Sequence, residues 1–286
     1  MLAYRHAFHA GNHADVLKHI VLVALLRHLN HKEKGWRCVD THAGAGGYSL
    51  KSGYAHQGRE HASGIGRLWP LRGDPSLPPL LADYLALVEQ FNGSPTLGQY
   101  PGSPALARLL QREQDQLRLY ELHPTDHKIL ASYLGSVPGA EVKMADGYAS
   151  LKAVLPPPTR RGLTLIDPPY ELKTDYAKTL AALREALTRF ADGIVLIWIP
   201  QLALLEAAQL PQRLKASAQG HAKKGWLHAR LTVQGTTDAR GYGLLGSSVF
   251  VANPPHTLAA ALRKLMPLLA AELGQDSAAG WVVEEG

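Results

Sequence analysis

Apolar residues follow two alternating patterns along this chain, one with helical spacing and one in short, nearly uninterrupted runs. Helical spacing predicts helices over residues 13–31, 80–91, 103–116, 125–134, 147–154, 176–190, 202–214 and 258–271. The short runs predict strands over residues 36–40, 117–121, 141–144, 163–166, 193–199, 227–233 and 248–252. Strands that alternate with helices are typical of an α/β fold, and the last two strands are close enough to form a hairpin edge. We therefore expect a seven-stranded, mostly parallel sheet with one antiparallel strand.

Glycine and proline are dense between residues 52 and 102, where only residues 80–91 have clear helical spacing. We interpret residues 52–102 as a small helical insertion in a single domain that spans residues 1–286. The packing of this insertion should depend on the main domain. The stretch that follows it places Ser103 at the expected cap of the next helix, and Asn12 is the corresponding candidate cap of the first helix.

Four predicted strands end in a carboxylate, supplied in chain order by Asp40, Glu121, Asp146 and Asp167. In open α/β sheets ligands bind outside the carboxyl ends of the strands, and an acid at the end of the second strand accepts ribose hydroxyls. The glycine-rich loop around Gly44 lacks the Gly-Lys-Ser/Thr of a Walker A loop and matches the dinucleotide fingerprint only in part. Any single acid could merely cap a helix, but the set indicates a nucleotide-type cofactor site.

The strand before Asp167 is followed by two prolines, which stop it because proline cannot donate to a sheet ladder. Asp167 and the Pro168 carbonyl are two acceptors that could hold the hydrogens of a nucleobase amine and turn its delocalised lone pair towards an electrophile. Tyr170 offers a flat face on which a base could stack, an interaction of roughly 1–3 kcal/mol. This Asp-Pro-Pro-Tyr stretch resembles the signature of S-adenosylmethionine-dependent methyltransferases that act on adenine N6, cytosine N4 or glutamine. The alternative is a structural acid before a proline-rich turn.

Charge and composition narrow the class of protein and its partners. The chain has 286 residues, a formal net charge of +6 and a pI near 9.3, which favours a polyanionic partner. Cys38 is the only cysteine in the sequence, which excludes an internal disulfide and a cysteine-based zinc site and fits the reducing cytoplasm. We expect no membrane association, since no apolar run approaches the roughly 18–20 residues of a membrane span. His9 and His13 lack an obvious third ligand, so we expect no metal.

Several motifs together resemble one family more closely than a superfamily. They are the stretches 4–19, 40–46, 100–104, 121–124, 145–147 and 166–171, which span nearly the whole chain. In this combination they resemble the RlmJ family, bacterial methyltransferases of adenine N6 in the RNA of the large ribosomal subunit. The resemblance implies a Rossmann-like class I methyltransferase fold with S-adenosylmethionine as the cofactor. It also implies a monomer that acts on 23S rRNA, before full subunit assembly, without a metal.

The resemblance also implies roles for individual residues. Catalysis is expected from Asp167 with Pro168 and Tyr170, and the substrate RNA is expected at Tyr4, Arg5 and His6. The cofactor is expected to contact Lys18, His19, Asp40, His42, Gly44, Ser103, Glu121, Asp146, Gly147 and Asp167. The reaction would be a direct displacement on a flipped or unpaired base, because stacking in a duplex would block the approach.

Two rival functions fit part of the same pattern. A DNA adenine-N6 methyltransferase shares the Asp-Pro-Pro-Tyr motif, whereas a non-catalytic nucleic-acid-binding protein on the same fold predicts no binding of S-adenosylmethionine. A mechanism through Cys38 is disfavoured, because this residue lies inside a predicted strand without an activating partner. The basic pair Arg160 and Arg161 is expected to contact RNA phosphates near the crevice.

Overall fold

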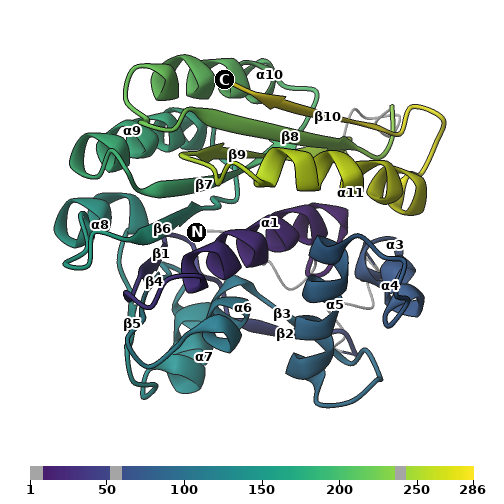
Figure 1. The fold of residues 1–286 in the computed structure, drawn as a ribbon, viewed down its shortest axis with the longest axis horizontal. Coiled ribbons are helices and arrows are strands. Elements are labelled where there is room, and N and C mark those ends of the chain that lie inside the picture. The colour runs from purple at the N-terminus through teal and green to yellow at the C-terminus, as the bar shows by residue number, and fades with distance from the viewer. Residues whose placement is uncertain (1–8, 52–59, 236–242) are drawn as a thin grey trace.

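The computed structural model describes residues 9–51, 60–235 and 243–286, and it contains one large sheet between two layers of helices (Figure 1). The order of the strands across the sheet is β10-β8-β9-β7-β6-β1-β4-β5. Their bounds are β1 Arg37–Asp40, β4 Gln116–Tyr120, β5 Ala140–Lys143, β6 Gly162–Ile166, β7 Ile194–Gln201, β8 Trp226–Thr232, β9 Gly246–Ala252 and β10 Gly280–Glu285. The five strands from β5 to β7 are parallel, and each of the pairs β7–β9, β9–β8 and β8–β10 is antiparallel.

The predicted mostly parallel α/β sheet is confirmed, but its strand count is wrong. All seven predicted strands form, including the hairpin edge of β8 and β9, and β10 is an eighth. Two strands, β9 and β10, therefore run against the others rather than one. The prediction missed β10 because no residue of this edge strand is buried, and its apolar run of Trp281, Val282 and Val283 is short and lies in a polar tail.

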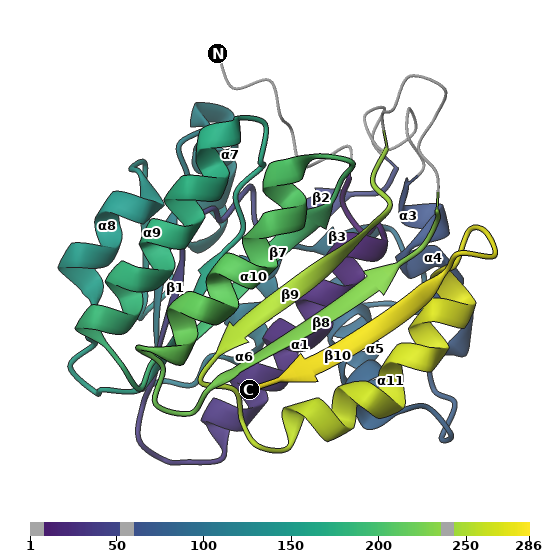
Figure 2. The ribbon, with the colours of Figure 1, turned by 90° about the horizontal axis from the view of Figure 1, so that it is seen from above.

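The helices divide between the two faces of the sheet, and each face has its own apolar core. The first face carries α1 His13–Asn30, α6 Ser103–Leu110, α7 Pro124–Leu134 and α11 Leu258–Leu273. The second face carries α8 Gly147–Val154, α9 Lys173–Arg189 and α10 Leu205–Gln219, which lie side by side in Figure 2. Helix α1 contacts β9, β7 and β6, and its predicted cap is confirmed, since the Asn12 side chain accepts from the amides of Ala14 and Asp15.

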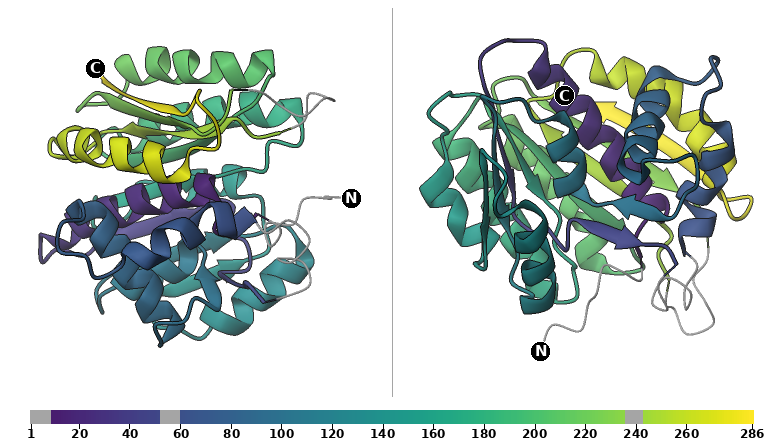
Figure 3. Two further views of the ribbon diagram at one scale, coloured as in Figure 1. Left: turned by 90° about the vertical axis from the view of Figure 1, so that its right-hand side faces the viewer. Right: turned by 90° about the horizontal axis from the view of Figure 1, so that it is seen from below.

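A short two-stranded sheet, β2 Gly47–Ser49 with β3 Gln99–Pro101, flanks a run of helices that we call the helical segment (described residues 60–98). This segment contains α3 Glu60–Ser63, α4 Ile65–Leu68, the 3-10 turn η2 Trp69–Leu71 and α5 Pro79–Asn92. Its buried side chains share the core of α1, and Figure 3 shows it beside α1 on the face away from α10. The helices other than α5 are only one turn long, so periodicity could not reveal them. The bounds 52–102 of the insertion stay a prediction.

Two local predictions at the ends of elements are wrong. Gly102 caps α6 and Ser103 is its first residue, so the Ser103 hydroxyl is directed to a partner outside the helix. The pair Arg160 and Arg161 precedes β6, whereas Asp167 follows it, so the arginines lie at the opposite edge of the sheet from Asp167. The Arg161 guanidinium donates to the carbonyls of Leu29 and Lys34 and thereby holds the end of α1.

Candidate active site

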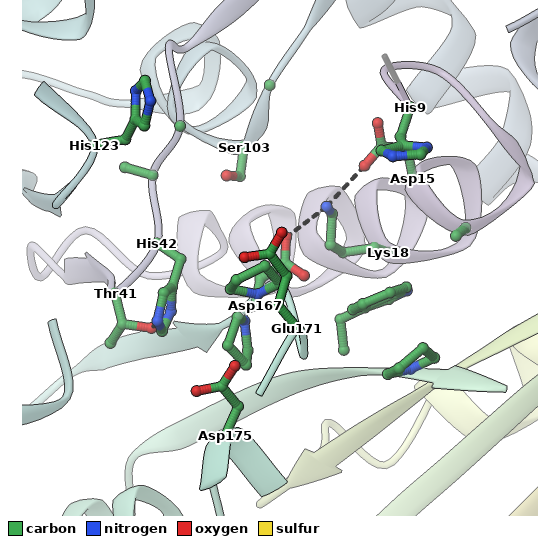
Figure 4. A pocket seen from close by; sticks show the side chains of 18 of the residues that line it. His9, Asp15, Lys18, Thr41, His42, Ser103, His123, Asp167, Glu171 and Asp175 are labelled. Carbon is green, nitrogen blue, oxygen red and sulfur yellow. Dashed lines mark hydrogen bonds and ion pairs between the residues drawn. The ribbon is translucent and has the colours of Figure 1, made fainter. Parts of the chain in front are cut away.

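A cavity of about 480 Å³ lies at the carboxyl ends of the parallel strands (Figure 4). This volume is within the range of about 300–1,000 Å³ that is typical of small-molecule sites. Nine residues that the sequence analysis assigned to catalysis or to the cofactor line it, namely Lys18, His19, His42, Gly44, Ser103, Glu121, Asp146, Asp167 and Pro168. The strand-end acids and the first helix therefore meet in one place, although they are up to 149 positions apart in the chain.

A buried lysine joins two carboxylates at the centre of this cavity. Lys18 Nζ donates to Asp15 Oδ1 at 2.7 Å and to Asp167 Oδ2 at 2.6 Å, as the dashed lines in Figure 4 show. Burial alone would lower the pKa of Lys18, but the two carboxylates outweigh it and raise this pKa above its ordinary value. Lys18 therefore stays charged and holds Oδ2 of Asp167. Oδ1 of Asp167 takes no part in this ion pair.

Glu121 organises the glycine-rich loop. Its two carboxylate oxygens accept from the amides of Gly44 at 2.8 Å and His123 at 2.6 Å, which ties the loop after β1 to the loop after β4. A carboxylate has about four lone-pair positions, so two further acceptor positions suit a pair of neighbouring hydroxyls. The geometry leaves room for the ribose hydroxyls, and the role of Glu121 in binding them stays a prediction.

Asp40 and Gly147 do not line the cavity, which corrects the direct contacts expected of them. The carboxylate of Asp40 is buried, accepts from the Ser103 hydroxyl at 2.6 Å and from the His42 amide at 3.2 Å, and so holds two residues that do line it. Burial raises the pKa of Asp40 to about 7. A side chain at Gly147 would lie 2.1 Å from the Thr41 carbonyl, so this glycine lets α8 begin directly against the first loop.

His42 is held as a neutral acceptor. The Thr41 hydroxyl lies 3.0 Å from the Leu165 carbonyl, to which it donates its only proton, so at its 2.8 Å contact with His42 the imidazole Nδ1 must be the donor. Burial lowers the pKa of His42 to about 4. The ring packs edge-on against Tyr148 with 4.7 Å between centroids, and its Nε2 is left as the acceptor.

His19 lines the cavity from a buried position and belongs to a chain of hydrogen bonds with two tyrosines. Its Nδ1 lies 2.8 Å from the Tyr100 hydroxyl, which lies 2.8 Å from the Tyr84 hydroxyl, and the rings of His19 and Tyr100 stack at 5.5 Å. Burial raises the pKa of both tyrosines. His19 is thereby positioned by α5 and β3, so the helical segment contributes to the wall of the cavity.

The structure does not support the stacking role predicted for Tyr170. This ring is only 6% exposed, does not line the cavity, and packs on Tyr176 at 4.7 Å and on Trp198 at 5.9 Å. Its backbone has a φ of +52°, and its hydroxyl donates to the Trp198 carbonyl at 2.8 Å. The left-handed turn after the two prolines thus directs the ring inwards, and Trp198 takes its place among the residues that line the cavity.

Tyr4, Arg5 and His6, the residues predicted to contact RNA, lie outside the described residues. Their roles stay a prediction.

Comparisons with known proteins agree with the geometry of the cavity. Residues 33–284 match the family model described as "Ribosomal RNA large subunit methyltransferase D, RlmJ". The chain is 43% identical over 289 residues to ribosomal RNA large subunit methyltransferase J of Escherichia coli, with all of both chains covered. It is 41% identical to the protein of the same name from Haemophilus influenzae, covering 99% of this chain and 98% of that one. The chain belongs to the RlmJ family.

A solved structure supports the fold independently of function. The Legionella pneumophila protein LPL1258 is 32% identical, covers 97% of this chain and 98% of its own, and superposes with a TM-score of 0.87. Membership of the RlmJ family confirms the predicted class I methyltransferase fold, and the protein is a methyltransferase that uses S-adenosylmethionine. In the described residues no helix meets the length and hydropathy of a bilayer span, and no three metal-ligating side chains converge.

The charge of the cavity suits this RlmJ-family cofactor. Among the described lining residues there are two lysines, Lys18 and Lys178, against eight carboxylates: Asp15, Glu60, Glu121, Asp126, Asp146, Asp167, Glu171 and Asp175. A negative cavity attracts a sulfonium and an ammonium group and repels the phosphates of a nucleic acid. The cofactor therefore fits inside, and the RNA backbone has to be held outside.

We predict that Glu121→Ala weakens binding of S-adenosylmethionine by a factor of roughly 10–150, since a hydrogen-bonded charged acceptor contributes about 1.5–3 kcal/mol. Glu121→Gln keeps one acceptor oxygen and should fall between the wild type and the alanine variant. Titration calorimetry measures both dissociation constants. Equal affinity of the wild type and Glu121→Ala for S-adenosylmethionine would show that Glu121 does not bind the cofactor.

Sequence reasoning missed several residues of the RlmJ-family site, including Asn12, Asp15, Thr41, Tyr148 and Trp198. A signal existed for Asp15, because it precedes Lys18 by three positions and therefore shares a face of the predicted helix. No such signal existed for Trp198, because an aromatic residue inside an apolar strand is usually part of the core.

Proposed function

We propose that this protein methylates adenine N6 in 23S rRNA. The curated relatives are named for the RNA of the large ribosomal subunit, and Asp167 with the Pro168 carbonyl follows the strand that ends at the cavity. The observation that carries the proposal is the Lys18–Asp167 pair. It holds the Asp167 carboxylate in a fixed orientation beside the Pro168 carbonyl, where a purine amine would enter.

The chain's own residues supply orientation and a proton acceptor. S-adenosylmethionine supplies an electrophilic methyl group when it is bound. Lys18 holds Asp167 Oδ2, so we assign Oδ1 and the Pro168 carbonyl to the two hydrogens of the amine. A carboxylate is too weak a base to deprotonate a neutral exocyclic amine, but the methylated, cationic amine is strongly acidic. Asp167 therefore orients the amine first and accepts its proton afterwards.

The target base is proposed to lie against apolar residues that line the cavity, among them Pro169, Leu172, Trp198 and Leu202. Leu172 is 56% exposed, so part of this apolar lining is accessible from solvent. A base has to leave its stack to reach Asp167, and these side chains offer apolar contact that replaces part of the lost stacking.

We further propose that the enzyme acts as a monomer in the cytoplasm, on 23S rRNA before full subunit assembly. The net charge of +6 supports a polyanionic substrate, although the cavity itself is acidic. Tyr4, Arg5 and His6 stay candidates for contact with RNA.

A DNA adenine methyltransferase is the rival that shares this chemistry, and matched oligonucleotides separate the two. We expect methyl transfer to an RNA hairpin of 23S rRNA and little transfer to the DNA hairpin of the same sequence, because 2′-hydroxyl contacts distinguish the substrates. Tritium transfer from labelled S-adenosylmethionine measures both rates. Faster transfer to the DNA hairpin would overturn the proposed substrate.

A further inference from the structure

One acid of the helical segment reaches across to the residues that precede α1. Glu60, at the start of α3, lies with both carboxylate oxygens 3.0 Å from His9 Nδ1, and its Oε2 accepts from Asn12 Nδ2 at 2.9 Å. The hydrogen bond with Glu60 raises the pKa of His9, as expected for an ion pair. These three residues also line the cavity.

The backbone is clamped at the same place. The Ile65 amide donates to the Gly11 carbonyl at 2.8 Å. A side chain on Gly64 would lie 2.1 Å from that carbonyl and 2.6 Å from Asn12, so only glycine permits this approach. Gly11 itself has a φ of +78° and no space for a side chain beside Ile65. The helical segment therefore fixes Gly11 and Asn12 through both side-chain and backbone contacts.

A continuous series of hydrogen bonds runs from this clamp to Asp167. Asn12 uses its carbonyl oxygen to cap α1, and Glu60 holds the amide group on its other side. The Gly11 amide donates to Asp15 Oδ2 at 2.9 Å, and Asp15 Oδ1 accepts from Lys18, which holds Asp167. A shift of Gly11 and Asn12 would thus change the position of Asp15, and with it the Lys18–Asp167 pair.

We infer that Glu60 is a positioning residue that couples the helical segment to the Asp167 carboxylate. The inference rests on the proposed role of Asp167. Glu60 touches no reacting atom in this scheme. It holds Asn12 and His9 so that the first turn of α1 presents Asp15 and Lys18 in the geometry that orients Asp167.

The helical segment contacts α1 at other places too, and one of these contacts provides a control. A second ion pair joins the helical segment to α1, since Arg27 Nη2 lies 2.7 Å from Asp83 Oδ1. Its exposure, 47% and 32%, is close to the 40% and 37% of the His9–Glu60 pair, and among the described residues no hydrogen bond links Arg27 or Asp83 to Lys18. Asp83→Ala therefore removes one carboxylate from the same segment and serves as the matched control for Glu60→Ala.

The test measures single-turnover methyl transfer to a 23S rRNA hairpin at saturating RNA and cofactor. Glu60→Ala should lower this rate by about tenfold or more, since small displacements of catalytic groups are costly. Asp83→Ala should stay near the wild-type rate. Affinity for S-adenosylmethionine should change far less than the rate in Glu60→Ala, which removes one of eight lining carboxylates, and should be unchanged in Asp83→Ala. A wild-type rate in Glu60→Ala, or a loss confined to KM for RNA, would overturn the inference.

A second pair of variants separates positioning from loss of fold. Asn12→Asp still caps α1 but replaces the amide donor with a carboxylate that repels Glu60, so it should show the same loss of rate. Glu60→Gln combined with Asn12→Asp reverses donor and acceptor across the contact and should recover most of the rate. Failure of this double variant to exceed Asn12→Asp would contradict the coupling. An inactive wild type would overturn the proposed function instead, whereas an active wild type with unaffected variants overturns only this inference.

Discussion

Replacing Asp167 with alanine is expected to abolish methyl transfer to RNA while leaving the fold and the cofactor site in place. The variant loses both the acceptor that orients the amine and the base that takes its proton. One preorganised group alone is worth about 10²–10³ in rate, so the loss of both roles should bring transfer close to background. Lys18 keeps a partner in Asp15, so no unpaired buried charge results. Single-turnover assays with labelled cofactor measure the rate.

Asp167→Asn is the informative companion of this variant. It keeps an acceptor oxygen, loses the charge and adds a competing donor, so its rate should fall between wild type and Asp167→Ala. Calorimetry should give cofactor dissociation constants close to that of the wild type for both variants. Near-normal single-turnover methylation by Asp167→Ala would show that Asp167 is not catalytic and that its role is structural.

Replacing Lys18 with methionine is expected to reduce both stability and rate. Asp15 and Asp167 would face each other without the cation between them, and breaking a buried ion pair typically costs about 3–5 kcal/mol. Methyl transfer should fall by about tenfold or more, because Asp167 loses the contact that fixes its orientation. Thermal unfolding and single-turnover assays measure the two effects.

Two further variants separate these effects of Lys18. Adding Asp15→Asn to Lys18→Met leaves a single carboxylate and should recover part of the stability but not the rate. Arg27→Met removes a cation from the same helix at an exposed pair, where the expected cost is only about 0–1 kcal/mol. A Lys18→Met protein that transfers methyl groups at the wild-type rate would show that Asp167 needs no partner.

The parts of the fold that the sequence predicted are those in which a local pattern has one physical cause. Seven strands and the long helices were predictable because their buried apolar residues recur at a regular spacing. The acids at the strand ends meet because parallel strands have their carboxyl ends at the same edge of the sheet. Asn12 was predictable as a cap because the motif is local. The exposed strand β10 and the one-turn helices α3 and α4 carry too little burial or length for a periodic signal.

The parts of the site that the sequence could not predict depend on contacts between distant residues. Tyr170 was expected in the cavity, but its inward direction depends on a left-handed backbone turn and on the space beside Tyr176 and Trp198. Asp40 was expected to touch the cofactor, yet Ser103, 63 positions later, occupies its carboxylate. The contact of Glu60 with Asn12 joins residues 48 positions apart, and a periodic sequence pattern cannot predict such a pair.

Mass mapping of 23S rRNA shows whether this protein methylates adenine N6 in that RNA. The RNA is compared from cells with the gene, cells without it, and cells that carry Asp167→Ala in its place. We expect one N6-methyladenine that is present with the wild-type gene and absent in the other two strains. The same set of methylated adenines in all three strains would contradict it.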